Sequence, residues 1–158
     1  MLPKMKRAPQ EMRTYSLTAI TAGRRSLFQV TATAELFIDT IQTYRLKQKF
    51  ELYCFVVMPD HVYLLPTPAP DTPLEKTVQL IKGGFSFRLK HKLEIWERGY
   101  YDRRILDGMS FDTCRQYIEQ NPVRAHLATR AHEYASTSAT RPEMVDPKPA
   151  WFQGENQG

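Results

Sequence analysis

The chain has 158 residues, the length of about one domain, and its 42% apolar and 25% charged residues are ordinary globular usage. No apolar run approaches the roughly 20 residues that span a bilayer, and the basic N-terminus lacks the apolar stretch of a signal peptide. The only two cysteines, Cys54 and Cys114, lie in unrelated segments, so we expect a reducing, cytoplasmic compartment. Composition thus excludes membrane proteins, disulfide-rich secreted proteins and disordered chains.

The net charge of +5 is unevenly distributed along the chain. Residues 1–50 hold nine Lys and Arg against three acidic residues, whereas the remainder is nearly balanced. Such a basic excess favours a polyanionic partner, with nucleic acid as the first candidate. A solvated basic surface without a partner is the alternative that charge alone leaves open.

The first half of the chain predicts a strand, a helix and a hairpin. Residues 13–21 alternate polar and β-forming apolar side chains, which is typical of a strand. A helix is expected from about Thr33, because its apolar positions follow helical spacing. Residues 50–58 are apolar on both faces, so they predict a central strand, and residues 61–65 its hairpin partner.

Prolines make residues 66–72 a stiff loop, after which a second helix is expected. Thr72 can cap this helix and Pro73 suits its first position. Gly83 and Gly84 interrupt its apolar stripe at a cost of about 1 kcal/mol each relative to alanine. They indicate either a kink or the close approach of a ligand backbone.

The last third predicts a strand at 97–106 and a helix from Ser110 to Asn121, followed by a short helix at 123–129. No periodicity follows residue 138, so a loose tail is expected.

The resulting β-α-β-β-α-β order predicts an α/β (α+β) protein with the ferredoxin-like split β-α-β arrangement. Its antiparallel sheet carries helices on one face, and C-terminal helices follow. We expect a basic N-terminal segment at 1–12, one domain at 13–139 and a flexible tail at 140–158.

Two residue pairs could carry chemistry. His61 and Tyr63 lie two apart on a strand and share a face, whereas Tyr117 and Asn121 lie four apart on a helix and share a face. Each pair alone is a weak signal, because a strand histidine is more often structural and a helix tyrosine is more often part of a core.

Several ordered motifs resemble one known family. Val57-Met-Pro-Asp-His-Val-Tyr-Leu-Leu is similar to the VMPxHxHLL signature of the HUH single-tyrosine transposases of insertion sequences. Further blocks in the same order are Ile81-Lys-Gly-Gly-Phe-Ser, Trp96-Glu-Arg-Gly-Tyr-Tyr-Asp-Arg-Arg-Ile, Tyr117-Ile-Glu-Gln-Asn-Pro-Val-Arg-Ala and Glu133-Tyr-Ala-Ser-Thr-Ser-Ala. The combination, over residues 13–139, resembles the REP-associated tyrosine transposase branch.

The resemblance implies a DNA transesterase that cuts and rejoins single-stranded or hairpin DNA. Tyr117 matches the nucleophile, which forms a 5′-phosphotyrosine link and leaves a free 3′-hydroxyl. His61 matches the first metal-binding histidine and Asn121 an amide ligand, and the implied metal, Mg²⁺ or Mn²⁺, would polarise the scissile phosphate. The implied partner is DNA and not a membrane, and the chain would act as a monomer or a homodimer.

Tyr63 departs from the family pattern, which has histidine at this position. A phenol, with a pKa near 10, must lose a proton to bind a metal well, whereas imidazole is a neutral donor at pH 7. We therefore expect weakened metal binding. The alternative function is a catalytically impaired protein that binds DNA hairpins. An unrelated ferredoxin-like RNA-binding or small-molecule module is a third hypothesis, which the ordered motifs disfavour.

Basic and aromatic side chains supply candidates for contacts with DNA. Trp96, Tyr100 and Tyr101 could stack on unpaired bases, although Trp96 could equally be core. The candidates for phosphate contacts are Arg24, Arg25, Lys82, Arg88, Lys90, Arg103 and Arg104.

Overall fold

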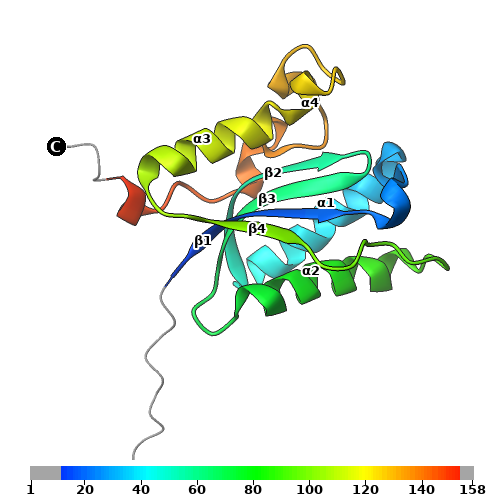
Figure 1. Ribbon diagram of the computed structural model, residues 1–158, viewed down its shortest axis with the longest axis horizontal. Helices are drawn as coiled ribbons and strands as arrows, with labels where there is room; N and C mark the ends of the chain where they lie inside the picture. Colours follow the sequence, from blue (N-terminus) through cyan, green and yellow to red (C-terminus); the bar gives the residue numbers. More distant parts are fainter. Residues whose placement is uncertain (1–11, 154–158) are drawn as a thin grey trace, which may run out of the picture.

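A computed structural model describes residues 12–153, in which four antiparallel strands form one sheet of order β2-β3-β1-β4 (Figure 1). This order is that of the ferredoxin-like split β-α-β fold and confirms the predicted fold class. No helix within residues 12–153 is long and apolar enough to cross a membrane. The elements are β1 (Thr14–Ile20), α1 (Thr31–Leu46), β2 (Phe50–Met58), β3 (His61–Pro68), α2 (Leu74–Leu89), β4 (Tyr101–Ile105), α3 (Gly108–Glu119) and α4 (Asn121–Arg124).

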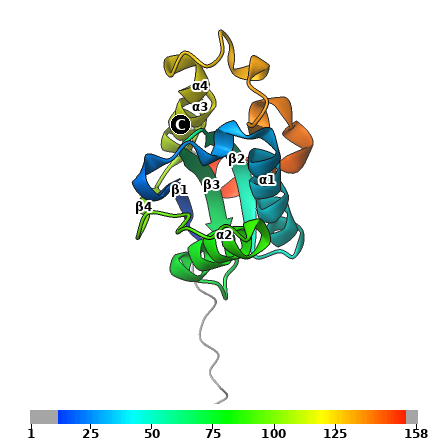
Figure 2. The same ribbon diagram turned by 90° about the vertical axis from the view of Figure 1, so that its right-hand side faces the viewer.

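Helices cover both faces of the sheet. Helices α1 and α2 lie on one face and α3 on the other, as Figure 2 shows in a view along the strands. The α1–α2 side is filled by an aromatic cluster of Phe28, Phe37, Phe85 and Trp96, with neighbouring ring centroids 5.4–6.0 Å apart. On the α3 side Phe111 packs against the sheet. The fold therefore has two separate cores.

Strand β2 lies at an edge of the sheet, so the prediction that it is central is wrong. It is buried on both faces because α1 covers one and α3 the other. Its outer edge is hydrogen-bonded to residues 134–153, the C-terminal segment. The amide of Val57 donates to the carbonyl of Ser136 over 2.8 Å, and the amide of Asp146 donates to the carbonyl of Leu52 over 2.7 Å. This segment thereby protects an edge that would otherwise expose unpaired backbone groups.

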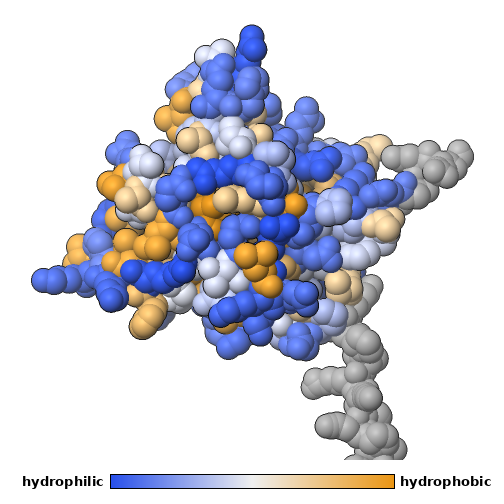
Figure 3. Space-filling model, turned by 180° about the vertical axis from the view of Figure 1, so that it is seen from behind, coloured by the Kyte–Doolittle hydropathy of each residue, from blue (hydrophilic) through white to orange (hydrophobic). Residues whose placement is uncertain are grey.

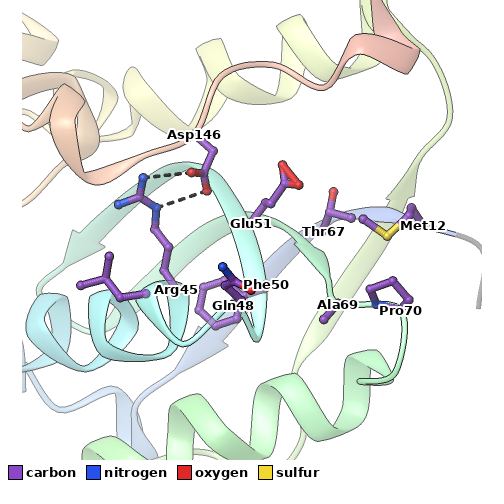
Figure 4. A pocket seen from close by; sticks show the side chains of 10 residues that line it. Met12, Arg45, Gln48, Phe50, Glu51, Thr67, Ala69, Pro70 and Asp146 are labelled. Atoms are coloured by element: carbon purple, nitrogen blue, oxygen red, sulfur yellow. Dashed lines mark hydrogen bonds and ion pairs between the residues drawn. The ribbon is translucent and has the colours of Figure 1, made fainter.

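The expected flexible tail is not loose over residues 140–153. Asp146 forms an ion pair with Arg45 of α1 over 2.9 Å, beside a cavity of about 430 Å³ (Figure 4). Phe152 is buried, and its ring centroid lies 5.4 Å from that of Phe111. The sequence shows no periodicity here because the segment is anchored by single contacts in short turns. Residues 1–11 of the predicted basic segment and residues 154–158 lie outside the described part of the chain.

The surface beside this segment mixes hydrophilic and apolar patches. Figure 3 shows the face that carries α1, seen from behind. Arg141 of the C-terminal segment bonds there to Glu35 of α1, which ties the segment to the helix layer. The segment is thus part of the folded unit.

Several element boundaries differ from the prediction. Strand β3 continues to Pro68, because Pro66 and Pro68 lie beyond the residues that pair with β1 and need no amide for that pairing. Thr72 bonds to the carboxylate of Asp71 and does not cap α2. Helix α3 is capped by Asp107, which accepts from the amide of Ser110 over 2.7 Å. The short last helix lies at Asn121–Arg124 and not at 123–129.

The glycine pair in α2 has two different environments. A Cβ atom on Gly84 would lie 2.5 Å from Oη of Tyr44, whereas one on Gly83 would meet nothing within 4 Å. Gly84 therefore allows α1 and α2 to pack closely. The predicted alternatives for the glycine pair, a kink or the close approach of a ligand, do not describe this role.

Candidate active site

The two predicted residue pairs meet between the sheet and α3. His61 and Tyr63 alternate along β3 with residues of the α1–α2 core, so their side chains point toward α3. The ring of Tyr63 lies edge-on to both neighbours: its centroid is 5.1 Å from that of His61 and 5.9 Å from that of Tyr117. Asn121, one helical turn after Tyr117, is 9% exposed and lines the same cleft. The structure thus joins residues that the sequence could group only in pairs.

His61 is held in place by a carboxylate. Its Nδ1 atom lies 2.7 Å from Oδ1 of Asp60, and the other oxygen of Asp60 accepts from Arg24 over 3.3 Å. Burial acts to raise the pKa of Asp60, but the hydrogen bond to His61 and the nearby Arg24 outweigh it and leave the pKa below its usual value. The contact with Asp60 fixes the orientation of the imidazole, which lines the cleft.

Tyr63 is a protonated phenol at neutral pH. Burial raises the pKa of its hydroxyl, and interaction with Tyr117 raises it further, against smaller opposing effects of Asn121 and Arg124. Tyr63, at the position where the family pattern has a histidine, is therefore a poor metal ligand.

Tyr117 is accessible and lies beside a positive charge. Half of its surface is exposed, and the guanidinium carbon of Arg124 lies 4.0 Å from its ring centroid. Arg124 also donates to the carbonyl oxygen of Tyr117. This stacking is a cation–π contact that orients the phenol. Arg124 is not among the residues predicted from the sequence, although its place seven residues after Tyr117 puts it on the same side of the helical segment.

The cleft in front of these residues has a volume of about 460 Å³. Its lining side chains come from β1, β3, β4, the turn after β1 and the start of α4. They are Thr18, Ile20, Arg24, His61, Tyr63, Tyr101 and Asn121.

The donor set does not fit the metal site that the resemblance implies. Among residues 12–153, no three His, Cys, Asp or Glu side chains gather into a group that could hold a metal ion. The cleft offers one imidazole, His61, one carboxamide, Asn121, and the protonated phenol of Tyr63. A site with a single imidazole and no anionic ligand holds a divalent cation weakly.

The predicted phosphate-binding residues do not form one surface. Arg24 lies at the cleft and Arg103 and Arg104 on β4. Lys82, Arg88 and Lys90 belong to or follow α2, on the opposite face of the sheet.

Some of these cations are engaged in the fold. Lys82 donates to the carbonyls of Glu97 and Gly99, and burial lowers its pKa. Arg88 pairs with Asp39 over 3.0 Å, and Arg25 donates to the carbonyl of Glu94. Their predicted contacts with DNA would compete with these bonds.

The three residues predicted to stack on bases lie in different environments. Trp96 is 7% exposed and belongs to the aromatic cluster, and Tyr100 is partly buried against the same core. Tyr101 is 61% exposed and lines the cleft. It is the one member of this trio that an unpaired base could reach.

Comparisons with known proteins bear on the fold and on the family. A structure of a REP-associated tyrosine transposase bound to a REP hairpin superposes with a TM-score of 0.75 at 21% identity, covering 96% of this chain and 91% of that one. A candidate transposase from Deinococcus radiodurans R1 gives 0.51 at 23% identity, covering 74% and 96%. No curated protein matches. The family model described as IS200-like transposase matches residues 10–121, more than half of the chain, and includes β1 to Asn121. The chain therefore belongs to the IS200-like transposase family.

Proposed function

We propose that this protein cuts and rejoins single-stranded DNA that folds into a hairpin, with Tyr117 as the nucleophile. The observation that carries the proposal is the half-exposed phenol of Tyr117, in contact with Arg124 and Tyr63 and beside the cleft of His61 and Asn121. The transposase of similar fold that was solved with a REP hairpin supports hairpin DNA as the substrate class. We infer a monomer or a homodimer acting in the cytoplasm.

The step is a transesterification. Oη of Tyr117 attacks the phosphorus, the bond to the 3′-oxygen breaks, and a 5′-phosphotyrosine forms. The phenolic proton passes to water, which reaches the exposed side chain, and the leaving 3′-oxygen takes up a proton to become a hydroxyl. A 3′-hydroxyl attacking the phosphotyrosine reverses these changes and rejoins the strand.

Neighbouring residues position and neutralise the reacting groups. Arg124 places positive charge beside the attacking phenol, whereas Arg24, which also lines the cleft, pairs with Asp60. IS200-like transposases use a divalent metal, for which we expect Mg²⁺ or Mn²⁺. Because His61, Tyr63 and Asn121 do not fit such a site, we assign no step to a metal.

The test is detection of a covalent protein–DNA adduct on a denaturing gel. The substrate is single-stranded hairpin DNA from palindromes flanking the gene, with Mg²⁺ or Mn²⁺ added. We expect an adduct with the natural chain, none with Tyr117→Phe, and an unchanged amount with the control Tyr15→Phe. An undiminished adduct in Tyr117→Phe would show that another residue is the nucleophile.

Tyr63 favours a second function, binding of DNA hairpins without cleavage. Tyr63 stands between His61 and Tyr117, where the family pattern has its second imidazole, and the raised pKa of this phenol makes it a poor substitute as a metal ligand. Restoring that imidazole with Tyr63→His separates the two functions. An adduct only in Tyr63→His means that the natural protein is a hairpin-binding protein on an intact scaffold, and an adduct in the natural chain means that the transesterase tolerates Tyr63.

A further inference from the structure

Two hollows lie on the side of the sheet that carries α3: the cleft, which Tyr101 lines and which Tyr117 borders through Tyr63, and a second one at the far end of β4. Tyr101 and Arg103 pair with Thr18 and Ser16 of β1, so both point to the α3 face of the sheet. On the helix, Ser110, Thr113 and Tyr117 recur at helical spacing, and the first two line a hollow of about 440 Å³ together with Arg103. We call the surface formed by Tyr101, Arg103, Ser110, Thr113 and Tyr117 the β4–α3 groove.

The two sides of the groove are of similar but unequal length. Seven residues of helix from Ser110 to Tyr117 extend over about 10 Å. Tyr101 and Arg103 lie about 7 Å apart along the strand. Because α3 follows β4 after a short connection and runs back along it, Tyr117 lies near the Tyr101 end and Ser110 near the other. The groove is therefore long enough for about two nucleotides.

The side chains along the groove alternate in chemistry. Tyr101 offers an exposed aromatic ring, Arg103 a guanidinium, and Leu106 and Met109 an apolar ledge at the far end, each 70% exposed. Within residues 12–153 no acidic side chain forms an ion pair with Arg103, and the carboxylate of Asp107 accepts from the amide of Ser110. Single-stranded nucleic acid binds to surfaces on which rings and apolar side chains flank a cation. Its bases stack on the rings and apolar side chains, and its phosphates pair with the cation.

We propose that the β4–α3 groove binds the unpaired DNA strand beside the hairpin, with a base stacked on Tyr101 and a phosphate paired with Arg103. This inference rests on the proposed function, since it takes the groove to begin at the nucleophile. Tyr101 thereby fixes the position of the strand relative to Tyr117, and the hairpin itself lies elsewhere on the protein.

The test compares two fluorescently labelled probes by anisotropy with the full chain. One probe is a DNA hairpin alone, and the other is the same hairpin with single-stranded extensions of about ten nucleotides on both sides. The variants are Tyr101→Ala, Tyr101→Phe and Arg103→Gln. The controls, Phe87→Ala and Lys47→Gln, remove an exposed ring and an exposed cation on the α1–α2 side of the sheet.

We expect Tyr101→Ala to weaken binding of the extended probe about ten-fold and to leave the hairpin alone unaffected, with Tyr101→Phe close to the natural chain. Arg103→Gln should lower the slope of log affinity against log salt by about 0.7 for the extended probe. The control variants should change neither probe.

Other results overturn the inference in distinguishable ways. If the natural chain prefers the extended probe and both groove variants keep that preference, the inference fails while the proposed function stands. If the natural chain binds neither probe, both fail. If Tyr101→Ala leaves DNA binding intact but converts a dimer to a monomer by light scattering, the occupant of the groove is a second copy of the chain.

Discussion

Single side chains around His61 make the stability of this protein depend on pH. The pKa of Asp60 is lowered in the folded chain, so the unfolded chain binds a proton more readily at this site. The ionised Asp60 contributes its full stabilisation at a pH above the pKa of an ordinary carboxyl group, about 4. This stabilisation is lost as the pH falls through the lower pKa that Asp60 has in the folded chain. We expect Asp60→Asn to reduce the free energy of unfolding at neutral pH, with the difference from the natural chain shrinking in acid. Urea denaturation between about pH 7 and pH 3 measures this.

The matched control at the residue scale is Asp102→Asn, which changes an exposed carboxylate on β4. Its difference from the natural chain should vary less with pH. A gap between Asp60→Asn and the natural chain that stayed constant down to about pH 3 would contradict the assigned role of the Asp60–His61 contact.

At the scale of elements, the two glycines of α2 should respond in opposite directions to alanine. Gly83→Ala adds a methyl group in open space and removes the helix penalty of glycine, so it should stabilise the protein by about 1 kcal/mol. Gly84→Ala brings Cβ within 2.5 Å of the Tyr44 hydroxyl and should destabilise it by about 1–3 kcal/mol. Thermal and urea unfolding of both variants give the comparison.

The Tyr44→Ala background identifies the cause of the Gly84 effect. If α1–α2 packing is responsible, Gly84→Ala should stabilise the Tyr44→Ala variant by about 1 kcal/mol, as Gly83→Ala stabilises the natural chain. If Gly84→Ala still destabilised the Tyr44→Ala variant, the glycine would be required for a reason other than its contact with Tyr44.

At the scale of the whole molecule, the C-terminal segment completes the sheet edge, and Asp146 is its main anchor. Its carboxylate pairs with Arg45 and accepts from the amide of Leu52 over 2.8 Å, and only 16% of the Arg45 side chain is exposed. Asp146→Ala should therefore cost about 3 kcal/mol, because it leaves the edge amide of Leu52 without this acceptor and the largely buried guanidinium of Arg45 with only the side-chain oxygen of Gln42 as a partner within residues 12–153. Denaturant unfolding with intrinsic fluorescence measures the loss.

Asp112→Ala is the control for this anchor. Asp112 pairs with Lys148 of the same segment over 3.0 Å but is itself half exposed, so its loss should cost less than about 1 kcal/mol. If both variants lost the same free energy of unfolding, burial of the Arg45–Asp146 pair would not explain how much this pair stabilises the protein.

Much of the fold could be predicted from local patterns. Alternation in β1, the apolar run of β2 and the helical stripes of α1 and α2 depend on neighbours in the chain, so the order of elements and the fold class follow from them. The prediction failed where distant contacts decide. The burial of both faces of β2, an edge strand, depends on α1 and α3, and the anchoring of residues 140–153 depends on Arg45 and Phe111.

The sequence by itself determined the family motifs, the pairs His61–Tyr63 and Tyr117–Asn121, and the replacement of a histidine by Tyr63, because each is a matter of residue type and short spacing. Only the tertiary structure decided that Tyr63 lies between His61 and Tyr117, that Arg124 stacks on Tyr117, and that Tyr101 reaches the cleft whereas Trp96 is core. These relations join β3, β4 and α3 across the sheet, and local spacing carries no information about which elements pack together.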